Sequence, residues 1–309
     1  RYFSSAASDV YKRQDIPAKD FRAKCRDYAN QQIAIQKKDF KRLGVLADWN
    51  NPYKTMDYSF EAGIVRALSE IVKSGHLVKG DKPVYWCPDC NSALAEAEVE
   101  YKDKTSSSID FLFEMETSRV NEIFDASVDE NTKTSFLSWT TTPWTIPGNV
   151  ALSVNPNLDY SLLEVKKDNS MQCLIICKDL IDSVLERCSI SDFTILSTKL
   201  GSILESAEAK HPYFDRKSTV ILGDHVTTEM GTGIVHTAPA HGLEDFHASN
   251  KYKLEIINHV GSDGRFLETA FDFSGMNLEE ANKKSIEMLE GQSNLLSKDS
   301  YQHSFPHCW

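Results

Sequence analysis

The chain has 309 residues, which suggests two domains, and its 41% hydrophobic residues are enough to form real cores. The formal net charge of -11 argues against a protein that coats nucleic acid non-specifically, because such binding depends on clustered lysines and arginines. No apolar run approaches the length of a bilayer span, so we expect no membrane segment.

The two ends of the chain suggest a fragment, because it does not begin with Met and stops at Cys308-Trp309 without a polar tail. Residues 1–14 are rich in Ser, Ala and Arg, like part of a transit peptide, and we leave them unassigned. Four cysteines in periodic segments are typical of reduced thiols in an intracellular protein: Cys25, Cys173, Cys177 and Cys188. We expect a cytoplasmic protein, with the mitochondrion as the alternative location.

Two amphipathic helices are predicted near the start of the chain. Apolar residues recur every three or four positions over about 17–43, and again from about 59 to a C-cap at Gly75. We expect the two helices to pack as one unit within a helical segment, 15–80.

A change to an extended pattern after Gly80 leads into Cys87-Pro88-Asp89-Cys90. Two thiolates at this spacing can bind one zinc ion, but a closed structural site needs four ligands. A redox pair is the alternative, although no βαβ pattern follows. The remaining late candidates for ligands are His303, His307 and Cys308. We predict a zinc site at Cys87, Cys90 and Cys308, with the fourth ligand beyond Trp309.

Short extended runs dominate from about 95 to 200, and one helix at about 178–187 interrupts them. Turns separate the runs, which lie at 98–101, 109–113, 135–139, 150–154, 160–165 and 173–177. Strands at this spacing favour a closed or partly closed β-barrel over a doubly wound sheet. The predicted fold class is therefore α+β with a barrel-like core.

The run Trp139-Thr140-Thr141-Thr142-Pro143-Trp144-Thr145-Ile146-Pro147-Gly148-Asn149 ends one of these strands. Threonine favours strands and proline cannot continue them, so the hydroxyls should lie at a strand end that meets solvent. Taken alone, the three threonines fit an ordinary edge strand better than a functional site. The functional alternative is that they form one wall of a hydrolytic pocket. Such a pocket requires a second wall from elsewhere in the chain.

The segment from Gly231 to Asp245 is the candidate second wall. It combines a strand end holding His236, a Gly/Pro loop, and carboxylates in the first turn of a helix. Its glycines do not indicate a nucleotide site, because the third glycine of the dinucleotide pattern and the P-loop lysine are both missing. His241 is a candidate zinc ligand or base, but no HExxH motif and no nearby cysteine supports a metal.

The last part of the chain is predicted to hold two short strands, 256–260 and 264–268, around a Gly-Ser-Asp-Gly turn. A final helix follows over about 278–289, capped near Asn277 and ended at Gly291.

Three segments together closely resemble isoleucyl-tRNA synthetases, a family of class I synthetases. They are the threonine run at 139–149, Gly-Thr-Gly-Ile-Val-His-Thr-Ala-Pro-Ala-His-Gly-Leu-Glu-Asp at 231–245, and Lys-Pro-Val-Tyr-Trp-Cys at 82–87 continuing to Ala-Leu-Ala-Glu-Ala-Glu-Val-Glu-Tyr at 93–101. Valyl and leucyl enzymes carry Thr-Thr-Arg-Pro where this chain has Thr-Thr-Thr-Pro-Trp. The resemblance covers nearly everything from Ile16 to Trp309.

The resemblance implies an editing domain inserted in a class I synthetase. In this interpretation 15–80 is the helical part of the catalytic region, 81–105 a zinc knuckle with connecting strands, 106–291 the editing domain, and 292–309 a return strand with the second half of the zinc site. The His-x-Gly-His and Lys-Met-Ser-Lys-Ser signatures are missing. The parent ligase would use ATP and magnesium, whereas this piece would not aminoacylate by itself.

The resemblance also implies the roles of individual residues. Thr140, Thr141, Thr142 and Asp245 are the expected catalytic residues, with hydroxyls around the ester and a carboxylate that holds the substrate's ammonium group. His236, Asn149, Trp144 and His241 are the expected substrate-binding residues. Isoleucyl-tRNA synthetase is itself the standard case for this task, since a pocket discriminates by one methylene only about 150-fold and a second site must destroy the valyl product.

The expected partners are tRNA(Ile), isoleucine and valine, with no membrane partner, and we expect a monomer. Editing should need no cofactor, because an ordered water beside hydrogen-bond donors can supply the chemistry. One alternative is a zinc-stabilised tRNA-docking module without hydrolytic activity. The other is a metallohydrolase that uses His236, His241 and Asp245.

Overall fold

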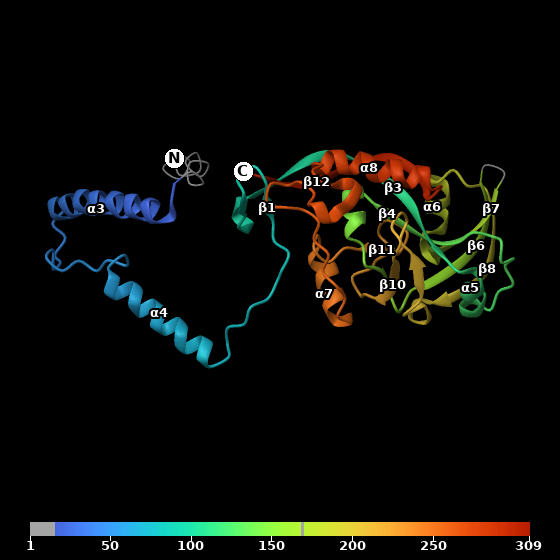
Figure 1. Ribbon diagram of the computed structural model, residues 1–309, viewed down its shortest axis with the longest axis horizontal. Coiled ribbons are helices and arrows are strands. Elements are labelled where there is room, and N and C mark those ends of the chain that lie inside the picture. Colours follow the sequence, from blue (N-terminus) through green and yellow to red (C-terminus); the bar gives the residue numbers. More distant parts are fainter. Residues whose placement is uncertain (1–15, 168–169) are drawn as a thin grey trace. The chain divides into compact units, whose positions relative to one another are not determined.

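The computed structural model describes residues 16–167 and 170–309, and the chain divides into two compact units, Arg1–Asp81 and Lys82–Trp309 (Figure 1). The unassigned stretch 1–14 lies outside the described residues. None of the helices in the described ranges combines the length and the hydropathy that a bilayer crossing requires.

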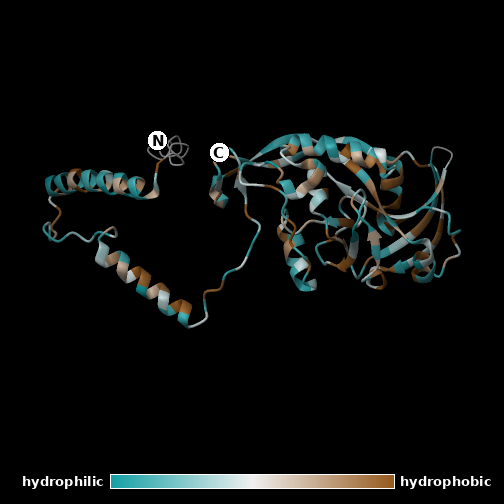
Figure 2. Ribbon diagram, in the orientation of Figure 1, coloured by the Kyte–Doolittle hydropathy of each residue, from teal (hydrophilic) through white to brown (hydrophobic). Residues whose placement is uncertain are grey.

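The first unit contains the two predicted helices, α3 (Ala18–Arg42) and α4 (Tyr58–Lys73). They contact each other through Arg26, which forms an ion pair with Glu61 and lies 4.4 Å over the Tyr58 ring. No residue of either helix is buried, so the expected packing unit has no apolar core in this part of the chain. Hydrophobic residues recur along α4 (Figure 2), and several of them are exposed, among them Ile64, Val65 and Leu68.

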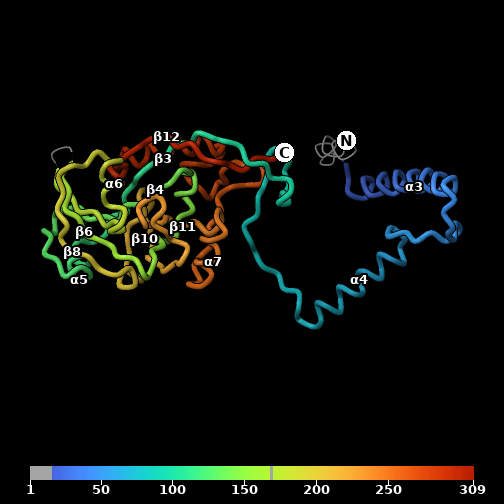
Figure 3. Tube along the Cα trace, turned by 180° about the vertical axis from the view of Figure 1, so that it is seen from behind, coloured from blue at the N-terminus to red at the C-terminus, as the bar shows by residue number. Residues whose placement is uncertain are grey.

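The second unit is built on a six-stranded sheet of order β12-β3-β4-β7-β6-β8. Its strands are β3 (Val99–Met115), β4 (Thr134–Thr140), β6 (Asp159–Lys167), β7 (Ser170–Cys177), β8 (Asp192–Leu200) and β12 (Leu295–Cys308). Neighbours pair antiparallel except β4 and β7, which are parallel. The runs predicted at 98–101 and 109–113 both overlap the single long strand β3, which pairs with β12 from Val99 to Phe111 (Figure 3).

A four-stranded sheet of order β11-β5-β10-β9 lies against the first one. Its strands are β5 (Ala151–Val154), β9 (Glu208–Lys210), β10 (Lys217–Leu222) and β11 (Ile234–Thr237). The Ser138 hydroxyl of β4 donates to the carbonyl of Ile234 in β11 at 2.9 Å and so connects the sheets. Fully buried aromatic and aliphatic side chains fill the core, among them Phe111, Phe113, Phe136 and Leu152.

Helices and a small hairpin complete the second unit. The helices are α5 (Thr117–Phe124), α6 (Ile181–Arg187), α7 (Leu243–Tyr252) and α8 (Leu278–Gly291), and the hairpin pairs β1 (Trp86–Cys87) with β2 (Ser92–Ala93). Short 3-10 helices are η1 (Glu96–Glu98), η2 (Pro143–Gly148), η3 (Lys178–Leu180), η4 (Gly201–Leu204) and η5 (Glu268–Phe273). The helix cap predicted at or near Asn277 is confirmed, because the Asn277 side chain accepts from the N–H groups of Glu279 and Glu280.

The prediction of a closed barrel is wrong for the described residues. The larger sheet has β12 and β8 as its edges, and the smaller one has β11 and β9, so the unit is a mixed α/β fold with two open sheets. Two parallel pairs, β4 with β7 and β5 with β10, need long crossover connections, which strand spacing alone does not show.

The prediction of strands at 256–260 and 264–268 is also wrong. The two segments make one isolated bridge, Val260 to Phe266, because Arg265 bridges to Asn277 instead and Glu268 begins the 3-10 helix η5.

Candidate functional site

The threonine run lies where β4 ends and η2 begins, at the predicted strand end. The Thr140 hydroxyl accepts the backbone N–H of Thr142 at 3.1 Å and lies 3.3 Å from the Thr142 hydroxyl. Thr141 is half-buried, and its hydroxyl has no hydrogen-bond partner among residues 16–167 and 170–309. Of the three hydroxyls, that of Thr141 is the one with no hydrogen-bond partner in the described residues, so all of its donor and acceptor capacity is open to a ligand.

His236 lies in β11 and is held at both ring nitrogens. Nε2 lies 2.7 Å from the Thr145 hydroxyl, and Nδ1 lies 3.2 Å from Nδ2 of Asn149. Since the Asn149 amide also donates to the carbonyl of Ala151 at 2.8 Å, Nδ2 is the donor and Nδ1 accepts. The proton of a neutral ring is then on Nε2 and is donated to Thr145.

The same network continues on both sides of the histidine. The Thr145 hydroxyl donates to the carbonyl of Thr142 at 2.9 Å, and the Ser218 hydroxyl donates to Oδ1 of Asn149 at 2.6 Å. Burial lowers the pKa of His236 to about 3, and His241 contributes in the same direction. His236 is therefore a neutral, fully bonded wall of the site and cannot act as its base.

His241 and Trp144 form a second contact between the two predicted walls. Their ring centroids lie 4.8 Å apart at 69°. Burial lowers the pKa of His241 to about 4, with a further contribution from His259. A Cβ on Gly148 would lie 3.2 Å from the carbonyl oxygen of Ile257 and 3.4 Å from the His241 ring, so this position is closely packed.

Asp245 lies in the first turn of α7 and has one free carboxylate oxygen. Oδ2 accepts the backbone N–H of Ala238 at 2.9 Å, whereas Oδ1 has no hydrogen-bond partner in the described part of the chain. Burial raises the pKa of Asp245, and the Ala238 N–H opposes that change. A half-buried carboxylate with one free oxygen is suited to binding a cationic group.

The structure thus brings the two predicted walls into contact, through Thr145 with His236 and Trp144 with His241. Sequence reasoning missed Thr145 as the partner that fixes His236. It also missed Asn282 of α8, whose Oδ1 accepts the Trp144 backbone N–H at 2.8 Å. The only sequence signal for Thr145 is that it stands inside the threonine run.

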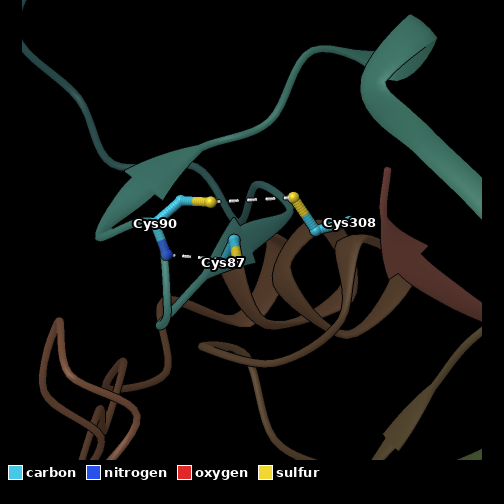
Figure 4. Close-up of side chains that lie close together, drawn as sticks. All are labelled: Cys87, Cys90 and Cys308. Atoms are coloured by element: carbon cyan, nitrogen blue, oxygen red, sulfur yellow. Dashed lines mark hydrogen bonds between the residues drawn. The ribbon is translucent and has the colours of Figure 1, made fainter. Parts of the chain in front are cut away.

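The three predicted zinc ligands come together at the end of the ribbon formed by β3 and β12 (Figure 4). The sulfurs of Cys87, Cys90 and Cys308 all lie within 4.8 Å of one another, and those of Cys90 and Cys308 are 3.9 Å apart. Thiolates bound tetrahedrally to zinc at about 2.3 Å would be separated by about 3.8 Å, so three of the four positions fit zinc.

Contacts around the cysteines hold the β1–β2 hairpin in place. The indole N–H of Trp86 donates to the carbonyl of Ser262 at 2.7 Å, and the backbone N–H of Cys90 lies 3.4 Å from the Cys87 sulfur. Within the described ranges, this is the one group of three or more cysteine, histidine or acidic side chains that could hold a single ion. His236, His241 and Asp245 do not form such a group, which argues against the metallohydrolase alternative.

Comparison with known proteins decides the family. A family model described as tRNA synthetases class I (I, L, M and V) matches residues 5–292. The chain belongs to this family. Among the similar proteins is an isoleucine–tRNA ligase of Shewanella sp. (strain W3-18-1), 50% identical over 296 residues, which are 96% of this chain and 32% of that protein. One from Chromobacterium violaceum is 49% identical over 297 residues, 96% of this chain and 31% of that protein.

The chain spans about a third of the length of the curated relatives it matches. Solved structures with some likeness include the editing domains of the cytosolic leucyl-tRNA synthetases of P. knowlesi and P. falciparum. The first has a TM-score of 0.48 at 14% identity and covers 63% of this chain and 97% of its own. The second has a TM-score of 0.47 at 13% identity and covers 65% of this chain and 100% of its own.

Proposed function

We propose that this chain is the part of an isoleucine–tRNA ligase that holds the editing site, and that it hydrolyses valyl-tRNA(Ile). The observation that carries the proposal is the contact between the two predicted walls, Thr145 with His236 and Trp144 with His241. One wall carries the Thr141 hydroxyl and the other an Asp245 carboxylate oxygen, neither of which has a hydrogen-bond partner in the described residues. The names of the similar proteins support the choice of amino acid and tRNA.

Asp245 would hold the α-ammonium group of the aminoacyl ester through Oδ1. The Ala238 N–H fixes the other oxygen, so the carboxylate is oriented before the substrate arrives. The Thr141 hydroxyl would then position the ester and a water molecule, with Thr140 and Thr142 holding the shape of the strand end.

His236 would contribute by shape. Both ring nitrogens are already bonded, so the imidazole limits the size of the substrate's side chain without forming a hydrogen bond to it. Trp144 and His241 would line the same pocket, and Asn149 would keep the histidine in its orientation. A wall of this kind discriminates by volume, which is what separating valine from isoleucine requires.

The parent ligase would attach isoleucine to tRNA(Ile) with ATP and magnesium at a catalytic region to which 15–80 belongs, with residues 106–291 as the editing domain. Zinc would bind at Cys87, Cys90 and Cys308 and connect 81–105 with 292–309. When bound it would supply a structural link, and the proposed hydrolysis uses no metal step. The zinc-stabilised tRNA-docking module remains the alternative without chemistry.

The test is the rate of valyl-tRNA(Ile) hydrolysis by the full-length protein carrying Asp245→Ala. Loss of the ammonium partner should slow hydrolysis by about 100-fold, the scale seen when one positioned charged or hydrogen-bonding group is removed from an active site. Glu244→Ala is the matched control, because Glu244 is the exposed acidic neighbour in the same helical turn.

Wild-type rates in both variants would refute the proposed role of Asp245. Undiminished hydrolysis after Thr141 and Thr142 are both replaced by Ala would show that the threonine run does not carry the reaction. No hydrolysis by the wild-type protein would favour the docking module.

A further inference from the structure

One face of the ribbon formed by β3 and β12 carries a continuous row of rings. Side chains two residues apart in a strand share a face, and here they are Tyr301, His303, Phe305 and His307. Their ring centroids follow one another at 5.7, 5.7 and 5.5 Å. Six residues of strand separate the first ring from the last, so the row is about 20 Å long.

Lysines of the neighbouring strand lie on the same face. His303 pairs with Lys104 and Phe305 with Lys102, and directly opposed residues of antiparallel strands point to the same side. The Lys104 ammonium lies 4.1 Å from the centre of the Phe305 ring. The Lys102 side chain is 57% exposed and forms an ion pair with Glu100 at 3.1 Å. We call Tyr301, His303, Phe305, His307, Lys102 and Lys104 the aromatic face.

The opposite side of the same ribbon segment has a different composition. Gln302 pairs with Thr105, Ser304 with Asp103 and Pro306 with Tyr101, so that side carries small polar and acidic side chains, a proline and one tyrosine. The four rings of β12 and both lysines are thus sorted onto one side of the ribbon, together with Glu100, which pairs with His307. In the described residues the hydrophobic core is built from other side chains, and the four rings stay half-buried, so core packing does not explain this sorting.

The aromatic face ends at the candidate site. Tyr301 meets Trp139 edge-on at 5.5 Å, and Trp139 directly precedes the threonine run. At the other end, His307 precedes Cys308 of the cysteine group. The ribbon therefore connects the predicted zinc site with the entrance to the threonine run by an unbroken row of rings.

We propose that the aromatic face binds the single-stranded 3′ end of aminoacyl-tRNA by base stacking and leads it toward Trp139. This inference rests on the proposed function, which makes an aminoacyl ester on an RNA end the substrate. Rings accept any base, and the adjacent lysines offset the phosphate charge on a chain whose net charge is -11. An apolar protein partner would not use the charge of Lys104, which lies over the Phe305 ring and forms no ion pair within the described residues.

The experiment uses the full-length protein and tRNA(Ile) whose 3′-terminal adenosine is replaced by the fluorescent base 2-aminopurine. Phe305→Leu removes the ring and keeps an apolar side chain, and should weaken binding about tenfold. Lys104→Gln should lower the slope of log affinity against log salt by about 0.7, the value for one phosphate contact to a single strand. Phe305→Trp should keep wild-type affinity.

Ser304→Ala and Gln302→Ala are the matched controls on the opposite side of β12 and should bind as the wild type does. Wild-type affinity and base fluorescence in Phe305→Leu would overturn the inference, as would equal losses in Phe305→Leu and Ser304→Ala, because equal losses indicate damage to the ribbon or a covering protein segment. Hydrolysis of valyl-tRNA by the wild-type protein, measured alongside, separates this outcome from failure of the proposed function.

Discussion

At the scale of single residues, the site depends on which polar groups are already bonded. Thr140, Thr141, Thr142, His236 and Asp245 could be singled out from the sequence because their residue types stand at predicted strand and helix ends. The hydrogen bonds of His236 could not be predicted, because they join residues 91 and 87 positions apart. A pattern of residue types cannot show that His236 is fully bonded while Thr141 is free.

This difference predicts unequal effects of the same substitution at two threonines. Thr145→Val removes the acceptor of the buried His236 N–H and should lower the free energy of unfolding by about 1–3 kcal/mol. Thr141→Val removes a hydroxyl that has no protein partner in the described residues. This substitution should change the free energy of unfolding by less than about 0.5 kcal/mol. Urea denaturation measures both. Equal losses of stability would show that the hydroxyl of Thr145 does not support His236.

At the scale of elements, the helices and one cap were predicted correctly from the apolar period and the capping residue. The long-range pairing of strands was not. The helices α3, α4 and α8 lie where the apolar period placed them, and Asn277 caps α8. Local sequence specifies these features. The closed barrel and the strands at 256–260 and 264–268 were wrong, because sheet order and pairing length depend on segments distant in the chain.

The loop before β11 offers a test of backbone geometry. Gly231 and Gly233 both have positive φ, +83° and +74°, but a Cβ on Gly233 would lie 2.2 Å from the Cβ of Cys177, whereas one on Gly231 would be 3.7 Å from the Trp139 ring. Gly233→Ala should therefore be destabilised by at least about 2 kcal/mol more than Gly231→Ala. Thermal unfolding of the two variants measures the difference, and similar melting temperatures would contradict the packing around Cys177.

At the scale of the whole molecule, buried neutral histidines make stability depend on pH. Burial lowers the pKa of His211 and His236 to about 3 and that of His241 to about 4. The unfolded chain binds protons at these side chains below about pH 6.5 and the folded chain does not, so stability falls as the pH is lowered from 6.5 toward 4. The raised pKa of Asp245 has the opposite effect, because the folded chain protonates this carboxyl more readily than the unfolded chain and so gains stability as the pH falls.

Each such histidine should contribute a slope of about 1.4 kcal/mol per pH unit within that window. His236→Gln should reduce the pH dependence of the free energy of unfolding by one such contribution, measured by denaturant titrations at several pH values between 7 and 5. An unchanged slope would mean that His236 takes up a proton in the folded protein.

The most direct test of the central claim compares the hydrolysis of valyl-tRNA(Ile) and isoleucyl-tRNA(Ile) by the full-length wild-type protein in single turnovers. If the His236 wall selects by side-chain volume, the valyl ester should be cleaved about 10–200 times faster, the range expected for one methylene. Equal rates for the two esters, or no cleavage of either, would contradict the account.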